Sequence, residues 1–359
     1  MNRRIFIVTG LLVCFLAETS AQESIGKRNY SRTLPAGREI RLEVNNRYGN
    51  IRIDNWDSDS VMISATVEAT APDRAKMEKM LDGIDIDVYE EGTSVVAETL
   101  FDNEARILLE TFKGFTGNII NYNSRLEIDY EIKLPVRADI KIRNQFGDVI
   151  MGNNTGNVSV NLSNGNFSAA SLNRISDLSL DFGEAEIESL KSGKIITSFS
   201  KFRIAVCEDL SVSSTSSDFD LGKVKDLDVN SRRDKFYIDN LQGIKGSSYF
   251  SEYYVEDMEG EADITLRFGQ FEAERIRNMG NQNFVTTNCD LSLDFDPSES
   301  FGFEIRHTNA FVVVADRLRP ERKTLDAERK EYLTNGMTGT RQGINELMID
   351  ATRGNIHLK

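Results

Sequence analysis

The chain has 359 residues and a net charge of −14 at neutral pH, with 57 acidic side chains against 43 Lys and Arg. An acidic surface of this kind repels nucleic-acid phosphates and anionic lipid head groups at long range, so neither is an expected partner. The length would ordinarily divide into two or more domains, but a repeat protein escapes this limit because each repeat contacts only its neighbours.

Residues 1–21 predict a cleaved secretory signal peptide. Two arginines precede an apolar run over 5–17, and small residues occupy 19–21, where a signal peptidase cuts. The run is too short to cross a bilayer, and no other stretch predicts a transmembrane segment. Cys14 follows the branched Val13, where a lipoprotein signal requires a small residue, so a lipid anchor is the less favoured alternative. We expect an exported protein, in the periplasm or on the outer cell surface, with residues 22–359 forming one solenoid domain.

A corner motif occurs three times along the chain. Each copy has two alternating apolar residues, four further residues, and then glycine, Asn or Asp, and an apolar residue. Glycine suits a tight corner that needs a positive φ. The copies are Leu42 and Val44 with Gly49-Asn50-Ile51, Ile140 and Ile142 with Gly147-Asp148-Val149, and Leu347 and Ile349 with Gly354-Asn355-Ile356. They predict that both ends of the chain use the same coil type as the middle.

Two segments interrupt the coil pattern. The first, about 69–123, holds a helix pattern from Asp73 to Leu81, flanked by Pro72 and Gly83, and then strand patterns at 84–88 and 95–99. We expect a small α/β excursion or cap here, because an open solenoid end exposes unpaired strand edges. The second segment, 318–343, is rich in charge and predicts a solvated helix or mobile loop. A partner-docking arm is the alternative.

Between these segments, large apolar residues recur every 17 or 18 positions, widening to 20 at the last two steps. This marker row consists of Val149, Phe167, Ala185, Phe202, Phe219, Phe236, Tyr253, Phe271, Leu291 and Phe311. A second row follows two residues later: Ala169, Ile187, Ile204, Leu221, Ile238, Val255 and Ala273. A third follows after five residues: Leu172, Leu190, Cys207, Val224, Leu241, Met258 and Ile276. A fourth follows after eight: Ile175, Gly193, Leu210, Leu227, Ile244 and Met279.

Short alternating segments separated by two-residue polar breaks are the pattern of short strands joined at corners. They predict an all-β fold, a single-stranded parallel β-helix (β-solenoid) with three short sides per 17–18-residue coil and rows stacked at about 4.8 Å. Left-handed β-helices usually show strict hexapeptides, so this looser spacing favours a right-handed winding. Phe202, Phe219, Phe236 and Tyr253 would then form an aromatic stack. The residues before the markers would stack with alternating charge, which supports the register: Glu184, Lys201, Asp218, Lys235 and Glu252.

The corner motifs, together with the segments 51–56, 61–65, 130–135 and 350–358, resemble a known family. It is the adhesin-like family of uncharacterised function DUF4097, related to the autotransporter adhesin head (GIN) domain and common in exported proteins of Bacteroidetes. The resemblance implies a β-helix and an adhesin-like role, and it brings no catalytic residues. The long excursion after Ala69 departs from the family's usual pattern.

We predict no catalytic, cofactor-binding or metal-ligating residues. His307 and His357 lack a metal-ligand spacing and are expected on strand surfaces. Cys207 falls in an inward row, and Cys289 lies about five coils later, roughly 24 Å along the axis. A disulfide cannot span that distance, so two unpaired thiols are expected.

Three functions stay open. The leading hypothesis is a non-catalytic, adhesin-like binding or interaction module of the cell envelope, whose partner is an envelope protein or a glycan. The alternative is a structural spacer or self-assembling envelope scaffold. The least favoured is a polysaccharide lyase or hydrolase on a β-helix, with Arg232, Arg233 and Asp234, or Asp218 and Asp220, as imagined catalytic groups. The oligomeric state is not predicted.

Overall fold

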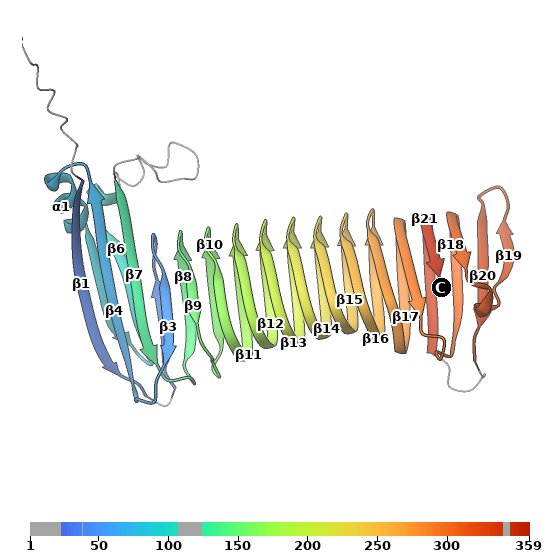
Figure 1. Ribbon diagram of the computed structural model, residues 1–359, viewed down its shortest axis with the longest axis horizontal. Helices are drawn as coiled ribbons and strands as arrows, with labels where there is room; N and C mark the ends of the chain where they lie inside the picture. Colours follow the sequence, from blue (N-terminus) through green and yellow to red (C-terminus); the bar gives the residue numbers. More distant parts are fainter. Residues whose placement is uncertain (1–22, 38, 107–123, 340–344) are drawn as a thin grey trace, which may run out of the picture.

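The computed structural model describes residues 23–37, 39–106, 124–339 and 345–359. The predicted signal peptide, residues 1–21, lies outside this range, as do residues 107–123 of the first excursion. The described chain is all-β apart from a nine-residue α-helix, a short helical stretch at 103–106 and a short 3₁₀ turn, and its strands belong to a single hydrogen-bonded sheet network. The strands lie side by side along the long axis of an elongated body (Figure 1).

Long parallel strands build the middle of the molecule. They are preceded by β8 (Asp139–Gln145), β9 (Val149–Met151) and β10 (Val158–Ser163), and comprise β11 (Phe167–Asp181), β12 (Glu184–Ser198), β13 (Lys201–Thr215), β14 (Asp218–Arg232), β15 (Lys235–Tyr249), β16 (Glu252–Arg267) and β17 (Gln270–Phe295). From β11 to β17 each strand is linked to the next by two residues and pairs with it in parallel. We call one such strand with its connection a coil. The architecture is β-solenoid-like.

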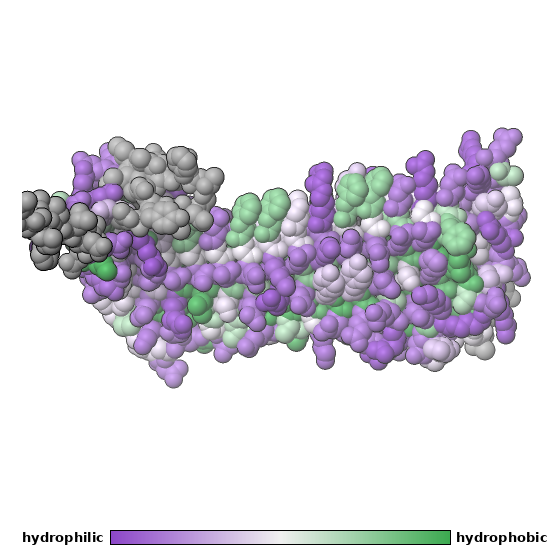
Figure 2. Space-filling model, turned by 45° about the horizontal axis from the view of Figure 1, so that its top comes forward, coloured by the Kyte–Doolittle hydropathy of each residue, from purple (hydrophilic) through white to green (hydrophobic). Residues whose placement is uncertain are grey.

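Each coil turns one set of side chains inward. In β13 the inward residues are Phe202, Ile204, Cys207, Leu210, Val212 and Ser214, all buried. The alternation breaks on either side of Cys207, where two consecutive residues face outward, so the strand bends there. Hydrophilic residues cover most of the face seen in Figure 2.

The predicted aromatic stack is confirmed. The ring centroids of Phe202 and Phe219 lie 5.5 Å apart, those of Phe219 and Phe236 4.6 Å, and those of Phe236 and Tyr253 4.7 Å. The alternating charges also stack as predicted: Glu184 pairs with Lys201, and the row continues coil by coil to Glu252. The first three predicted rows are in register from β11 to β17.

The fourth predicted row is wrong at two members. Ser176, not Ile175, pairs with Gly193, and Ile175 is 62% exposed. Gln282, not Met279, continues the row beyond Ala262. Both errors fall in coils longer than 17 residues, where the extra residues form bulges between the third and fourth rows and shift the count.

The marker row also fails at its last member, because the C-terminal strand is inserted into the stack. β21 (Asn345–Leu358) lies between β17 and β18 (Phe301–Val314) and pairs in parallel with both. Leu291 therefore pairs with Ile356, and Ile356 pairs with Val312. Phe311 is not part of the inward row and is 63% exposed.

The N-terminal segment is inserted in the same way. β2 (Arg41–Asn45) lies between β8 and β6 (Ser94–Phe101), and β3 (Ile51–Asn55) lies between β9 and β7 (Arg125–Leu134). Ile51 pairs with Val149, just as Ile356 pairs with Leu291. The prediction that the corner motifs share one coil type is thus confirmed.

Antiparallel strands cover the N-terminal end. β1 (Ser24–Pro35) pairs with β4 (Ser60–Ala71), which pairs with β7, while β5 (Ile84–Glu91) pairs with β6. The predicted helix is confirmed as α1 (Arg74–Asp82), where the Asp73 carboxylate accepts from the Lys76 N–H and Gly83 ends the helix. Met77, Met80 and Leu81 turn its apolar face inward.

In its described part, up to residue 339, the second predicted excursion is neither a helix nor a loop. After a 3₁₀ turn, η1 (Asp316–Leu318), it forms an antiparallel hairpin of β19 (Glu321–Asp326) and β20 (Glu331–Met337). β20 pairs with the first half of β18 and so satisfies the backbone groups of that edge. This pairing outweighs the helical tendency of the charged sequence. No helix in the described parts of the chain is long and apolar enough to cross a membrane.

Candidate functional site

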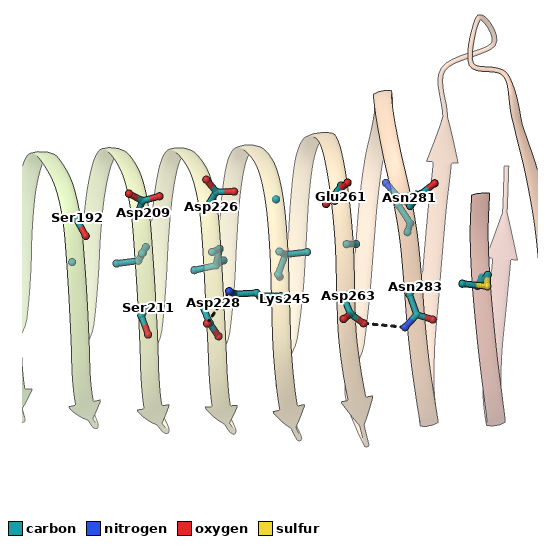
Figure 3. Close-up of a pocket in the computed structure, with 18 of the residues that line it drawn as sticks. Ser192, Asp209, Ser211, Asp226, Asp228, Lys245, Glu261, Asp263, Asn281 and Asn283 are labelled. Atoms are coloured by element: carbon teal, nitrogen blue, oxygen red, sulfur yellow. Dashed lines mark hydrogen bonds and ion pairs between the residues drawn. The ribbon is translucent and has the colours of Figure 1, made fainter. Parts of the chain in front are cut away.

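A groove of about 850 Å³ crosses several consecutive coils, from β12 to β17, and reaches β21. Two parallel rows of outward side chains line it, one on each side of an inward row (Figure 3). The first row runs through Ser192, Asp209, Asp226, Gly243 and Glu261. The second runs through Ser211, Asp228, Lys245, Asp263 and Asn283. Because the coils are in register, each row repeats its polar groups at the strand spacing of about 4.8 Å.

Acid dominates the groove. Lys245 lines the groove and is basic, and its ammonium group lies 3.5 Å from the Asp228 carboxylate. Lys225, from outside the lining, lies 3.1 Å from Asp226, and the Asn283 amide donates to Asp263 at 2.9 Å. Asp209, Glu261 and Glu346 add further carboxylates to the lining. The groove therefore offers mainly hydrogen-bond acceptors and a negative field, which suits hydroxyl, amide or cationic donors.

The floor of the groove belongs to the apolar interior. Leu210, Leu227 and Ile244 contribute to it and are 3% exposed or less. Gly243 places no side chain between those of Asp226 and Glu261 in the first row. A ligand in the groove would contact the two polar rows, because the apolar side chains between them are buried.

The imagined catalytic residues do not form a site. Asp234 is 1% exposed, and its carboxylate accepts from the Ser214 hydroxyl at 2.6 Å and from the backbone N–H groups of Ser217 and Arg232 at 2.8 and 2.9 Å. Arg232 instead extends over the ring of Tyr249, 5.7 Å from its centroid. Asp218 and Asp220 face outward on another side of the coil. In the described ranges no group of three or more His, Cys, Asp or Glu residues could hold a metal ion.

The predicted free thiols are confirmed, since Cys207 and Cys289 are both buried and unpaired. Burial raises the pKa of the Cys207 thiol to about 12. The prediction for His307 is wrong: it lies in a strand but is 1% exposed, because the β19–β20 hairpin covers it. Its Nε2 lies 3.2 Å from the Thr334 hydroxyl. His357 lies on β21 and is partly exposed, as expected.

Sequence reasoning missed both polar rows of the groove. The signal was present, because Asp209 and Asp226 are 17 positions apart, as are Ser211 and Asp228. From the sequence alone such residues are expected to be solvated outward positions. The strand register is needed to show that they lie on one side of the body.

No known protein-family model matches the chain, and no curated protein matches its sequence. Among solved structures, a candidate cell adhesion protein from Clostridium sporogenes is 13% identical over 93% of this chain and 100% of its own, with a TM-score of 0.21. A candidate adhesin from Bacteroides fragilis is 10% identical over 92% and 97%, with a TM-score of 0.27. A candidate lipid binding protein from Parabacteroides distasonis is 12% identical over 74% and 93%, with a TM-score of 0.29.

Proposed function

We propose that this chain is an exported, non-catalytic binding module of the cell envelope, adhesin-like in role. Its groove binds an extended, uncharged or cationic ligand, and a glycan is the first choice because sugar hydroxyls can donate to the carboxylate rows. The observation that carries the proposal is the in-register repetition of acceptors along the groove. A rigid row of acceptors at one spacing favours a polymer that lies along the axis over a compact small molecule.

The same proposal includes a fold and a location. The chain is a single-stranded, right-handed parallel β-helix, a divergent member of the adhesin-like family DUF4097, and acts in the periplasm or on the outer surface. Parallel pairing at a spacing of one coil supports the β-helix. The corner motifs, of which the copies at 49–51 and 147–149 pair in register, support the family. The basic, apolar and small-residue order of residues 1–21 supports export.

The test compares two variants of equal charge change. Asp226→Lys with Asp263→Lys reverses two carboxylates of the groove, while Asp220→Lys with Asp239→Lys reverses two exposed carboxylates outside its lining. We expect the wild-type chain and the second variant to bind on an array of neutral glycans and envelope extracts, and the groove variant to lose binding. Absence of binding by the wild-type chain, or equal binding by both variants, would contradict the proposal.

A rigid envelope spacer is the second candidate, favoured by the uninterrupted coils from β12 to β15. End-to-end self-assembly fits less well, because β19 and β20 cover half of the C-terminal edge. Protease shaving of intact cells would show whether the protein is on the outer surface or in the periplasm. Release of reducing sugar from acidic polysaccharides would instead support the polysaccharide lyase or hydrolase.

A further inference from the structure

One residue in each connection between coils has the left-handed backbone conformation. In consecutive coils this position is held by Phe182, Phe199, Ser216, Arg233, Phe250 and Phe268, with φ between 53° and 59°. Each donates its backbone N–H to the following coil, as Phe199 does to the Thr215 carbonyl at 3.1 Å. These residues therefore line up along one edge of the body, and we call them the corner ridge.

Phenylalanine is unfavourable at this position on two counts. A left-handed conformation costs an ordinary L-residue roughly 1–2 kcal/mol, and Asn or Gly tolerates it better. Asn164 takes this position in the preceding coil, at φ 55°. Phe182 and Phe199 are also 58% and 57% exposed, and Phe250 and Phe268 45% and 41%. Backbone strain and exposed apolar surface, repeated at equivalent positions, point to a contact made there.

The phenylalanines of the corner ridge are placed symmetrically about its midpoint. Phe182 and Phe199 form one stacked pair, with ring centroids 5.2 Å apart, and Phe250 and Phe268 form another at 5.1 Å. Ser216 and Arg233 separate the pairs. In Figure 2 hydrophobic groups rise in two places along the upper edge, with hydrophilic residues between them. Apolar positions that are symmetric about the midpoint of a surface allow it to pair with a copy of itself about a two-fold axis.

We propose that the corner ridge is the interface of an antiparallel homodimer. A two-fold axis passing between Ser216 and Arg233 sets Phe182 against Phe268 of the second copy, and Phe199 against Phe250. The exposed rings of each chain are then buried by those of the other. This inference does not rest on the proposed function of the groove.

Charges beside the corner ridge fit this arrangement. On the flank just before it, Asp181 meets Arg267 of the second copy. On the flank just after it, Lys201 meets Glu252 and Asp218 meets Lys235. In a parallel dimer opposite flanks would meet instead, bringing Asp181 to Glu184 and Arg232 to Lys235. Like charges at those places would disfavour the parallel form, so the charge pattern selects the antiparallel one.

Other occupants fit less well. The net charge of −14 opposes an anionic membrane. The paired rings turn their faces toward each other, with interplanar angles of 9° and 23°, which leaves few faces for a sugar to stack on. A second copy of the chain would contact both the exposed ring edges and the charged residues on the flanks of the ridge.

The first test measures mass by sedimentation velocity and light scattering over a wide range of protein concentration. We expect a reversible dimer. Phe199→Asn with Phe250→Asn should raise the dissociation constant at least about tenfold, since these rings are the apolar groups nearest the two-fold axis. Asn suits the left-handed conformation, so the fold should survive, as circular dichroism would show. Val206→Asn removes another exposed apolar side chain, 46% exposed and away from the ridge, and should leave the dimer unchanged.

The second test exchanges charges. Asp181→Arg and Arg267→Asp should each weaken the dimer, and the two together should restore it. These positions are five coils apart, about 24 Å along the axis, so the restored pair can form only between chains. The proposal would be overturned if the wild-type chain is a monomer at every concentration. It would also be overturned if the phenylalanine variants dimerise as tightly as the wild type, or if the double exchange does not restore the dimer. A monomeric chain that uses the ridge to bind neutral lipid vesicles or glycans would overturn it as well.

Discussion

The backbone N–H of Ser217 donates a 2.8 Å hydrogen bond to the buried carboxylate of Asp234, which holds the same position one coil further on. In the preceding coil the Ser200 N–H contacts the Ser217 hydroxyl at 3.3 Å, and in the following coil the Asp234 N–H contacts the Ser251 hydroxyl at 3.2 Å. A polar row thus runs inside the corner beneath Ser216 and Arg233. It satisfies backbone groups that the turn would otherwise leave buried without partners.

Replacing Asp234 tests this row. Asp234→Ala leaves the Ser217 and Arg232 N–H groups and the Ser214 hydroxyl without their acceptor. Because unsatisfied buried donors are costly, we expect the free energy of unfolding to fall by on the order of 3 kcal/mol. Urea denaturation followed by circular dichroism measures it.

Asp234→Ser is the matched control, because serine holds this position in three neighbouring coils and would accept again from Ser217. We expect it to cost only about 1 kcal/mol. Burial raises the pKa of the Asp234 carboxyl above its ordinary value of 3.8. Its contribution to stability is therefore largest below pH 3.8 and declines as the pH rises through the raised pKa. Equal losses in the two variants would show that the row does not depend on a hydrogen-bond acceptor.

The aromatic stack makes a second prediction. Phe219 is fully buried between Phe202 and Phe236, so Phe219→Ala should lower the free energy of unfolding by about 3–5 kcal/mol. Phe219→Leu keeps most of the volume and should cost clearly less. Denaturant unfolding of both variants checks this, and an alanine variant as stable as the leucine variant would contradict a close-packed stack.

Much of this fold follows from the sequence because the coil length is nearly constant. From Phe167 to Phe271 the spacing of large apolar residues locates each inward row. The reasoning fails where a coil gains residues, as at Ile175, because a bulge changes register without changing the pattern of residue types. It also fails at Phe311, since nothing local shows that a strand from the end of the chain is inserted before β18.

The candidate surfaces were harder to predict than the core. Inward residues share one chemical property, so a spacing identifies them, but the groove combines acids, serines and an asparagine that share only their position. Phe182 and Phe199 lie in the two-residue connections between coils, where residue type alone assigns them no role. Their significance depends on the left-handed φ and the exposure, and neither is visible in residue types alone.

Cys207 should be inert to thiol reagents in the folded chain. It is 2% exposed, and burial raises the pKa of its thiol to about 12, so very little thiolate forms near neutral pH. With Cys14 replaced by Ser, we expect iodoacetamide to modify neither Cys207 nor Cys289 until denaturant is added, as mass spectrometry would show. Val206→Cys places a thiol on the outward side of the same strand and should react in the folded state. Modification of Cys207 as fast as that of the introduced cysteine would contradict the inward assignment.

The hairpin over the C-terminal edge should weaken as the pH falls. His307 is buried beneath it, with its ring 5.4 Å from that of Tyr332 and its Nε2 at the Thr334 hydroxyl. Desolvation, and then the Arg322 guanidinium, lower the pKa of His307 below its ordinary value of 6.5. The open form therefore takes up a proton that the closed form resists, so the stability of the closed hairpin is full above about pH 6.5 and declines as the pH falls toward the lowered pKa.

Hydrogen exchange of the β20 amides on either side of pH 6.5, corrected for the intrinsic pH dependence, measures this opening. We expect less protection at the lower pH, whereas amides of β13 in the middle of the body should keep theirs. His307→Gln retains a hydrogen-bonding group for Thr334 but cannot take up a proton, so its β20 protection should no longer depend on pH in this range. The same loss of protection in the glutamine variant would show that protonation of His307 is not the source of the pH dependence.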